Sequence, residues 1–345
     1  GLRRRRLMTR KISHSLINGR TGAGTAGQGL KVEWDSTNDG ELHWMDVDES
    51  SLEAGPPWYG GRGVFAGQSN SITTIEYITI ASPGNYTDFG DLTVGRGNFD
   101  GCSNGSRGVF GGGYNTNDTG YNTIDYITIS TPGNATDFGD LTTGRYATAS
   151  CSDGTTGIFA SGASSSSRYD IIDYVTIATT GNATDFGNTS SSTRQGITAC
   201  SDSSRGVFGG GKDGSQHSDV IEYVTISTPG NATDFGNLTL ARKYMRACSS
   251  ITRGLFWGGS NSAKSNIIDY ITIQTTGNAT DFGDITVARD QGASFSDGTY
   301  GVYGGGEVAA PSNIIEYVTI ATLGNGTDFG DLSSGRNGAA GLSGD

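Results

Sequence analysis

The sequence predicts an all-β protein built from six repeated units, and three observations support this prediction. The phrase Asn-x-Thr-Asp-Phe-Gly occurs six times, and its phenylalanines are separated by 49, 48, 49, 47 and 47 residues. A period in this range is typical of propellers and solenoids. No segment has a sustained helical period, and 57 glycines among 345 residues disfavour helix throughout. The six phenylalanines are Phe89, Phe138, Phe186, Phe235, Phe282 and Phe329.

Each unit consists of four short extended segments separated by turn residues, which is what one propeller blade requires. Small residues such as 147–152 form the first type of strand, and residues 107–113, which end in a glycine run, represent the second. The third type, residues 124–129, is β-branched and aromatic on both faces, which predicts a strand covered on both sides. A Pro-Gly turn follows, and residues 135–141 complete the unit.

The ends of the repeat region distinguish a closed propeller from an open solenoid. The first unit begins at Arg62 without a small-residue strand, and residues 336–343 supply such a strand after the last unit. Pairing of this tail with the first unit leaves no sheet edge open, whereas a solenoid is expected to carry atypical capping repeats. We therefore predict a six-bladed β-propeller over residues 62–345 that is closed by the C-terminal strand.

Two family resemblances follow from these repeats. The repeat unit resembles the kelch type of propeller repeat, because an arginine, a small-residue segment, a strand ending in Gly-Gly and an aromatic strand follow one another in that order. It differs in having Phe where the last kelch strand carries Trp. The block at residues 172–187, Ile-Asp-Tyr-Val-Thr-Ile-Ala-Thr-Thr-Gly-Asn-Ala-Thr-Asp-Phe-Gly, is similar to repeats in virion and tail-fibre proteins of tailed phages that infect marine cyanobacteria. This resemblance implies a virion component, assembled in the host cytoplasm, that contacts the host surface.

Residues 1–61 lie outside the repeat and form a separate region. A basic arm at residues 3–11 is followed by a glycine-rich linker at residues 22–29. Residues 30–34 and 41–44 then alternate apolar and polar side chains around an Asn-Asp-Gly turn, which predicts a β-hairpin. We expect this region to attach the propeller to other virion proteins or to further copies of the chain.

The charge of the chain constrains its partners. The sequence has 23 basic and 35 acidic residues, for a net charge of −12, and residues 1–61 contain eight of each kind. The propeller therefore carries the whole excess, which argues against nucleic acid as a ligand. No apolar stretch follows the basic arm, so a secretory signal peptide is not predicted. We expect no membrane insertion and a protein present in several copies in an assembly.

Cysteine and histidine give no sign of catalytic chemistry. Four cysteines occupy one repeated position, which is Phe295 and Leu342 in the last two units. We therefore predict free, buried thiols, with a zinc site or a disulfide as the alternative. The three histidines are scattered, and we predict no catalytic residue, cofactor or metal. The cysteines are Cys102, Cys151, Cys200 and Cys248.

The repeated polar residues are predicted to be structural. We expect each Asp of the Asp-Phe-Gly phrases to cap a turn or to pair with a repeated arginine, and the Asn-x-Thr triplets to stabilise turns. Calcium at the Asp-Phe-Gly-Asp turns is the alternative, although one turn cannot supply six oxygen ligands. The aspartates are Asp88, Asp137, Asp185, Asp234, Asp281 and Asp328. The arginines are Arg96, Arg145, Arg194, Arg242, Arg289 and Arg336.

Positions at which the units differ are the candidates for recognition. The greatest divergence lies in the loops between the glycine strand and the aromatic strand, which should emerge on one rim because they join equivalent strands. Their Ser, Asn, Gly and Tyr residues suit adaptable hydrogen bonds and aromatic contacts. The loops are residues 68–73, 114–122, 163–170, 212–219, 260–266 and 307–313. The candidate contacts are Tyr114, Tyr121, Arg168, Tyr169, Lys212 and His217, and residues 243–246 are a second cluster that could line the central channel.

These observations favour a non-enzymatic virion protein, a tail fibre or a related appendage, that binds a host-surface glycan or another virion protein. Many weak contacts multiplied by copy number would then supply the affinity. A purely architectural capsid or tail decoration or connector is the near alternative. A glycan-cleaving propeller with paired carboxylates is a further alternative.

Overall fold

A computed structural model describes residues 59–69, 71–115, 120–189 and 193–344, and the backbone of two strands nearer the N-terminus. The chain divides into two compact units, Gly1–Ala54 and Gly55–Asp345. In the first unit, β1 (Leu30–Trp34) and β2 (Leu42–Asp46) pair antiparallel, with Val32 opposite Trp44. The predicted hairpin is therefore confirmed, whereas the basic arm and the glycine-rich linker lie outside the described residues.

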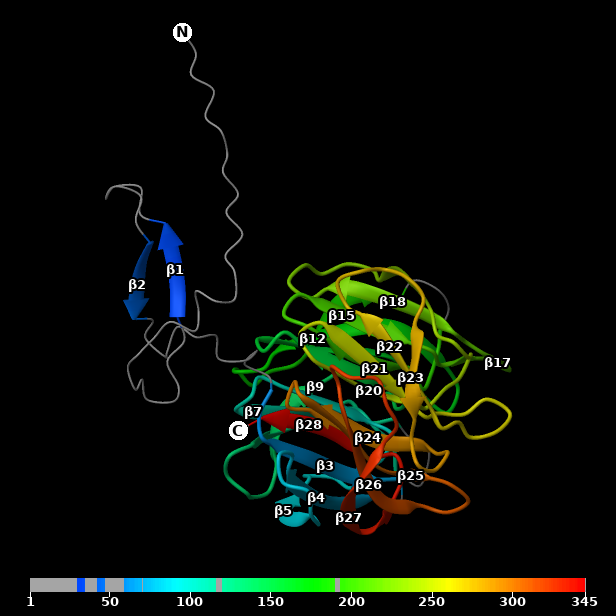
Figure 1. The fold of residues 1–345 in the computed structure, drawn as a ribbon. Coiled ribbons are helices and arrows are strands. Elements are labelled where there is room, and N and C mark those ends of the chain that lie inside the picture. Colours follow the sequence, from blue (N-terminus) through cyan, green and yellow to red (C-terminus); the bar gives the residue numbers. More distant parts are fainter. Residues whose placement is uncertain are drawn as a thin grey trace. The chain divides into compact units, whose positions relative to one another are not determined.

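The second unit contains six antiparallel sheets of four strands each within the described residues, which confirms the predicted propeller (Figure 1). We number the blades I to VI and name the strands of each blade A to D in the order in which they pair. Blade I comprises β28 (Ala340–Gly344), β3 (Arg62–Gln68), β4 (Ile72–Thr79) and β5 (Thr87–Asp91). Blade II comprises β6 (Asp100–Ser103), β7 (Arg107–Gly111), β8 (Thr123–Thr128) and β9 (Thr136–Asp140). Blade III comprises β10 (Ala149–Ser152), β11 (Thr156–Ala163), β12 (Arg168–Thr176) and β13 (Thr184–Asn188).

The remaining three blades follow the same plan. Blade IV comprises β14 (Thr198–Ser201), β15 (Arg205–Gly209), β18 (Val220–Thr225) and β19 (Thr233–Asn237). Its B–C loop contains a small hairpin of β16 (Lys212–Asp213) and β17 (Gln216–His217). Blade V comprises β20 (Arg246–Ser249), β21 (Arg253–Trp257), β22 (Ile267–Thr272) and β23 (Thr280–Asp284). Blade VI comprises β24 (Asp290–Ser296), β25 (Tyr300–Glu307), β26 (Ser312–Thr319) and β27 (Thr327–Arg336).

The C-terminal strand closes the ring, as predicted. Strand β28 pairs antiparallel with β3, so that Leu342 lies opposite Val64, and Figure 1 shows this red strand beside the blue one. The six A strands contact one another in a closed circle, in which β28 lies between β24 and β6. The first blade is therefore completed by residues from the opposite end of the repeat region.

The apolar core lies between neighbouring blades. In every blade the strand C tyrosine and the strand D phenylalanine pack edge to face, with ring centroids 5.9 to 6.2 Å apart. One core cluster combines Ile75 and Phe89 of blade I with Phe110 and Ile129 of blade II. Burial of both faces explains why the strand C sequence is apolar on both alternating sets of positions.

The asparagine of each Asn-x-Thr triplet links two blades. Asn182 Oδ1 accepts a hydrogen bond from the Asp140 backbone N–H of the preceding blade at 3.1 Å, and the Ala183 N–H donates to the Asp140 carbonyl at 2.7 Å. The equivalent asparagine contact occurs at all six joints. At the closing joint the Asp331 N–H donates to Asn85 Oδ1 at 3.2 Å. The triplets therefore connect neighbouring blades, in addition to forming turns.

The glycine and phenylalanine of the repeated phrase complete this outer contact. Gly139 has φ of +147°, and a Cβ atom there would lie 2.5 Å from the Gly181 carbonyl oxygen of the next blade. Only glycine fits such a close approach of two backbones. Phe138 is buried, whereas Asp137 is exposed. The phrase is thus an inter-blade joint, as its repetition predicted for a scaffold element.

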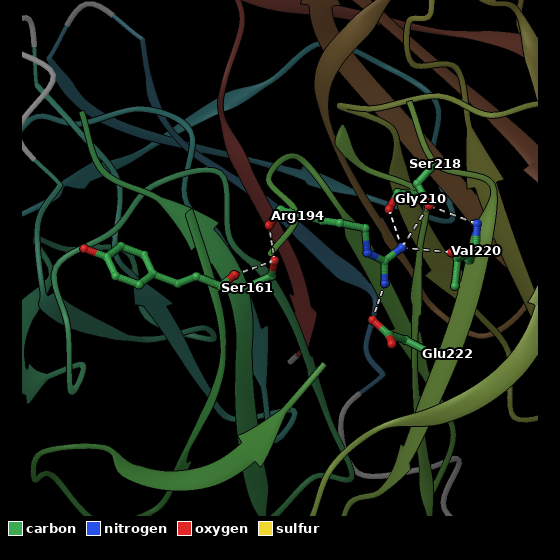
Figure 2. Close-up of polar contacts among 7 residues, drawn as sticks. Ser161, Arg194, Gly210, Ser218, Val220 and Glu222 are labelled. Carbon is green, nitrogen blue, oxygen red and sulfur yellow. Dashed lines mark hydrogen bonds and ion pairs between the residues drawn. The ribbon is translucent and has the colours of Figure 1, made fainter. Parts of the chain in front are cut away.

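The connection from strand D of one blade to strand A of the next contains a buried arginine. Figure 2 shows Arg194 paired with Glu222 on strand C of blade IV. The same guanidinium donates to the carbonyl oxygens of Gly210 at 2.7 Å and Val220 at 3.2 Å. The Arg194 carbonyl oxygen accepts a hydrogen bond from the Ser161 hydroxyl of blade III. One residue therefore links blades III and IV.

An equivalent ion pair forms at each of the six connections between blades, and both partners are at most 2% exposed. We call these connections joints and their arginines the joint arginines. Burial lowers the pKa of Arg96, Arg242 and Arg336, and the paired carboxylate counteracts this in each case. The pairs are Arg96–Asp125, Arg145–Asp173, Arg194–Glu222, Arg242–Asp269, Arg289–Glu316 and Arg336–Glu76. The last pair joins the end of the repeat region to its beginning.

These partners correct the expectation that the arginines pair with the Asp-Phe-Gly aspartates. All six of those aspartates are exposed on strand D. Successive side chains of a strand point to opposite faces, so a buried phenylalanine turns the preceding aspartate toward solvent. The acid that binds the arginine is the Asp or Glu that precedes the strand C tyrosine, as in Asp173 before Tyr174.

Two closed rings of hydrogen bonds surround the central axis. At one end the hydroxyl of each strand A serine donates to the carbonyl oxygen of the equivalent serine in the preceding blade, at 2.5 to 2.8 Å. At the other end the second residue after each joint arginine donates its backbone N–H to its counterpart in the preceding blade, at 2.6 to 3.2 Å. The serine ring is Ser103, Ser152, Ser201, Ser249, Ser296 and Ser343. The axial collar is Asn98, Ala147, Gly196, Tyr244, Gln291 and Gly338.

We expect the substitution Asp173→Asn to destabilise the propeller by roughly 3 to 5 kcal/mol, because it leaves the buried Arg145 charge without a counter-charge. The free energy of unfolding in urea measures this. Asp185→Asn, the same chemical change on the same blade, is the matched control because Asp185 is exposed, and its expected effect is within about 0.5 kcal/mol. Equal effects of the two substitutions would contradict the assigned pairing.

Candidate functional site

The axial collar lies at the centre of one face of the propeller and has an unusual backbone. All six residues have φ between +52° and +67°. Four of them are not glycine, namely Asn98, Ala147, Tyr244 and Gln291. The left-handed region costs an ordinary L-residue roughly 1 to 2 kcal/mol, and such conformations concentrate at ligand-binding sites. Hydrogen bonds to both neighbours in the collar hold each residue in this conformation.

The six B–C loops surround the collar on the same face, which confirms their predicted common rim. The first or second residue of each loop is hydrogen-bonded to the residue directly after a joint arginine. Four of these contacts are the bridges Gly97–Tyr114, Tyr146–Ala163, Gln195–Lys212 and Lys243–Ser260. In blades I and VI, the Ser69 N–H donates to the Asn337 carbonyl, and Asp290 pairs with Glu307. We call the collar together with these residues the axial face.

Three tyrosines lie close together on the axial face. The rings of Tyr114 and Tyr146 have centroids 5.0 Å apart and are tilted by 47°. Tyr244 covers Gly196, where a Cβ atom would lie 2.7 Å from the ring. Burial raises the pKa of Tyr244 to about 12, and the neighbouring Tyr146 and Tyr114 add to this shift. Aromatic surface therefore extends over the collar from blade II to blade V.

A cluster of three lysines, Lys212, Lys243 and Lys264, adjoins the tyrosines through Lys243. The Lys243 ammonium lies 4.6 Å from the centroid of the Tyr244 ring. Burial lowers the pKa of Lys243, and so do the nearby charges of Lys212 and Lys264, while Asp290 opposes them. His217 lies opposite Lys212 in the small hairpin, and its pKa is lowered by burial and then by Lys243 and Lys212. The axial face thus contains a basic cluster in a propeller of net negative charge.

The candidate contacts from the sequence are distributed over three loops. Tyr114, Lys212 and His217 lie in the aromatic and basic clusters just described. The Tyr121 hydroxyl accepts a hydrogen bond from Asn115 within its own loop, at 2.9 Å. In the blade III loop, Arg168 is exposed and the Tyr169 hydroxyl donates to Ser164 at 3.3 Å. The structure does not bring these last three side chains to the lysines.

Sequence reasoning missed Tyr146 and Lys264, and it placed Tyr244 in the channel cluster. Tyr146 directly follows a joint arginine, at a position where other units have Gly, Gln, Lys, Asp or Asn. Comparison of that column across the six units would have found both Tyr146 and Lys243. Lys264 lies within a loop of variable sequence, and no sequence signal places it next to Lys243.

The second predicted cluster, residues 243–246, divides between three environments. Lys243 and Tyr244 lie on the axial face, and Met245 is part of the apolar core. Arg246 points toward the axis, where its Nε donates to the Gly292 carbonyl at 2.6 Å and its Nη2 to the Ala339 carbonyl at 3.3 Å. The expectation that this segment lines the central channel therefore applies to Arg246 alone.

A buried carboxylate shares this part of the axis with Arg246. Asp100 on blade II accepts hydrogen bonds from the backbone N–H groups of Ser150, at 2.9 Å, and Gly101, at 3.0 Å. Burial raises the pKa of Asp100 to about 6, although Arg246 and these hydrogen bonds act in the opposite direction. Two opposite charges thus occupy the axis beneath the collar.

The axial cavity farther from the collar is small. It has a volume of about 80 Å³ and is lined mainly by the strand A serines, cysteines and glycines, with Tyr59 at its margin. This is room for two or three water molecules, whereas typical ligand pockets measure roughly 300 to 1,000 Å³. This cavity is therefore too small for a typical organic ligand.

The four cysteines are buried and free, as predicted. Each thiol packs against the strand B glycine of the next blade, as Cys151 does against Gly206. Burial raises the pKa of all four thiols, so they remain protonated at neutral pH. Phe295 and Leu342 fill the same place against Gly63 and Gly108. The position requires an apolar group that fits between two blades.

Two further features are absent from the described part of the chain. These residues contain no group of three or more His, Cys, Asp or Glu side chains that could hold a metal ion. They also contain no helix long and apolar enough to cross a membrane. Comparisons with protein-family models and with curated proteins find no match to this sequence. The propeller is therefore established by its geometry, while the kelch and phage resemblances rest on the repeat residues alone.

We expect the Asp100 carboxyl to make stability depend on pH. Its pKa is about 6 in the folded protein and about 3.9 when unfolded, so between these values the folded state binds the extra proton. The stability contributed by this group is therefore present at pH 4 and is lost as the pH rises through 6.

Urea unfolding of the wild type and of the Asp100→Asn variant between pH 4 and pH 7 measures this contribution. The variant should gain stability relative to the wild type with rising pH, by up to about 3 kcal/mol. A difference between the two proteins that stays constant with pH would contradict the raised pKa.

Proposed function

We propose that this chain is a non-enzymatic binding protein of a phage virion, a tail-fibre or appendage component whose axial face contacts a host-surface glycan or a protein partner. The observation that carries this proposal is the division between repeated and divergent positions. The repeated polar residues form contacts between blades. They are the joint arginines and their acids on strand C, the asparagines of the Asn-x-Thr triplets, and the serines of strand A. The side chains that differ between units gather on one face.

The composition of that face fits recognition. Tyr114, Tyr146 and Tyr244 supply flat, amphipathic surface, and Lys212 and Lys243 supply charge. Tyrosines are common in binding surfaces because they offer a large contact area with few rotatable bonds. The rigid ring of blades holds these side chains in place before a ligand arrives, which reduces the entropy cost of binding.

The assignment to a virion rests on the resemblance of residues 172–187 to phage tail-fibre repeats. The hairpin of β1 and β2 supports an attachment role for residues 1–61, because two strands of five residues each are only marginally stable alone. If many copies were attached to one particle, their individually weak contacts would together give a high avidity for the host surface.

Binding is favoured over hydrolysis by the state of the carboxylates on the axial face. A glycan-cleaving propeller requires two acids that flank the scissile bond. Here Asp290 and Glu307 both contact the Lys264 ammonium, at 2.6 and 3.1 Å. Asn337 donates to the other Glu307 oxygen at 2.7 Å. Both acids are thus already engaged by Lys264, and Glu307 also by Asn337.

We expect replacement of Tyr114, Tyr146 and Tyr244 by alanine to reduce adsorption of the purified protein to cyanobacterial host cells by roughly tenfold, because large aromatic contacts dominate binding energy. Leu323→Ala is the control, since Leu323 is 55% exposed in a C–D turn at the opposite end of the strands. Unchanged adsorption of the triple variant would favour the architectural decoration or connector role.

A further inference from the structure

We propose that the axial face binds a sugar residue that carries a carboxylate, with Lys212 and Lys243 on the carboxylate and the tyrosine rings against the sugar. This inference rests on the proposed function and names the chemical class of its ligand. Three features of the molecule support it, namely the balance of charge at the lysines, the position of Lys243 beside a tyrosine ring, and the charge of the whole protein.

The lysines of the cluster differ in how their charge is balanced. Lys264 is paired with Asp290 at 2.6 Å and with Glu307 at 3.1 Å. Neither Lys212 nor Lys243 has a carboxylate within 4 Å among the residues that the structure describes. Asp290 and Glu307 are thus both engaged by Lys264, and Lys212 and Lys243 are left without an ion pair among the described residues.

Without a ligand, the position of Lys243 makes its positive charge energetically unfavourable. Its ammonium is partly buried over the Tyr244 ring and repelled by Lys212 and Lys264. His217 shares the same positive surroundings. A carboxylate between Lys212 and Lys243 would relieve this repulsion and accept charge-assisted hydrogen bonds, which are about twice as strong as neutral ones.

The adjacent aromatic surface indicates that the anion is attached to a ring. Tyr244 covers Gly196 and has the Lys243 ammonium over its ring. The Tyr114 and Tyr146 rings lie 5.0 Å apart and close enough to Tyr244 to influence its pKa. Such rings offer an apolar face to the C–H groups of a pyranose. A carboxylate without a ring would leave this surface unused.

The charge of the whole protein selects against a long polyanion. The net charge is −12, so the field of the propeller repels a chain of closely spaced negative charges. At physiological salt, charges farther than about 8 Å apart are largely screened, and a local pair of lysines can still attract one carboxylate. A single acidic sugar, at a glycan terminus or as an isolated residue in a glycan, therefore fits the site best.

Ligand-observed NMR titration of the full chain tests this proposal with three probes at one ionic strength, namely sodium D-glucuronate, D-glucose and sodium acetate. We expect glucuronate to bind at least about fivefold more tightly than either control, because only glucuronate combines charge and ring. Lys243→Gln should weaken glucuronate binding roughly five- to tenfold and leave glucose binding unchanged. Arg168→Gln removes one exposed positive charge outside the cluster and should have no effect.

Three results would overturn the proposal. These are equal binding of acetate and glucuronate, equal binding of glucose and glucuronate, and equal losses from Lys243→Gln and Arg168→Gln. The proposed function is tested separately by adsorption to cells. Cell binding that is unaffected by Lys243→Gln would remove the acidic-sugar assignment and retain the binding role, whereas absence of cell binding would remove the binding role itself.

Discussion

A buried arginine at each connection joins one blade of the propeller to the next. A guanidinium out of water is costly unless a carboxylate and carbonyl oxygens surround it, and here those groups belong to the blade that follows the connection, as with Arg194 and Glu222. The arginine carbonyl oxygen is held by the preceding blade. Each connection is thus stable only when two neighbouring blades are in place, and the Arg336–Glu76 pair extends this requirement around the ring.

The same connections provide the surface for recognition. The collar is closed by backbone hydrogen bonds, so its side chains can differ between blades without opening the ring, and units place Ala147, Gly196 and Tyr244 at equivalent positions. The serine ring at the other end is made by side-chain hydroxyls, and serine is therefore present in all six units. Variation is tolerated where the backbone makes the contact, which concentrates the divergent side chains on the axial face.

Much of the fold was predictable because both the repetition of the blades and the closure of the ring can be recognised in a single sequence. The period, the strand types and the missing first strand gave six blades and the pairing of β28 with β3. The arginine partners were assigned wrongly, although an acid such as Asp173 in a strand that is apolar on both faces was an available signal. The clustering of Lys212, Lys243 and Lys264 was not predictable, since it depends on how loops of unrelated sequence fold onto neighbouring blades.

Closure couples all six blades into one cooperative unit, and native-state hydrogen exchange of a Glu76→Ala variant can show whether it does. This substitution breaks the closing ion pair between blades VI and I. We expect the most protected amides of every blade, including blade IV across the ring, to lose the same free energy of protection, roughly 3 to 5 kcal/mol. A loss confined to blades VI and I, with blade IV unchanged, would contradict it.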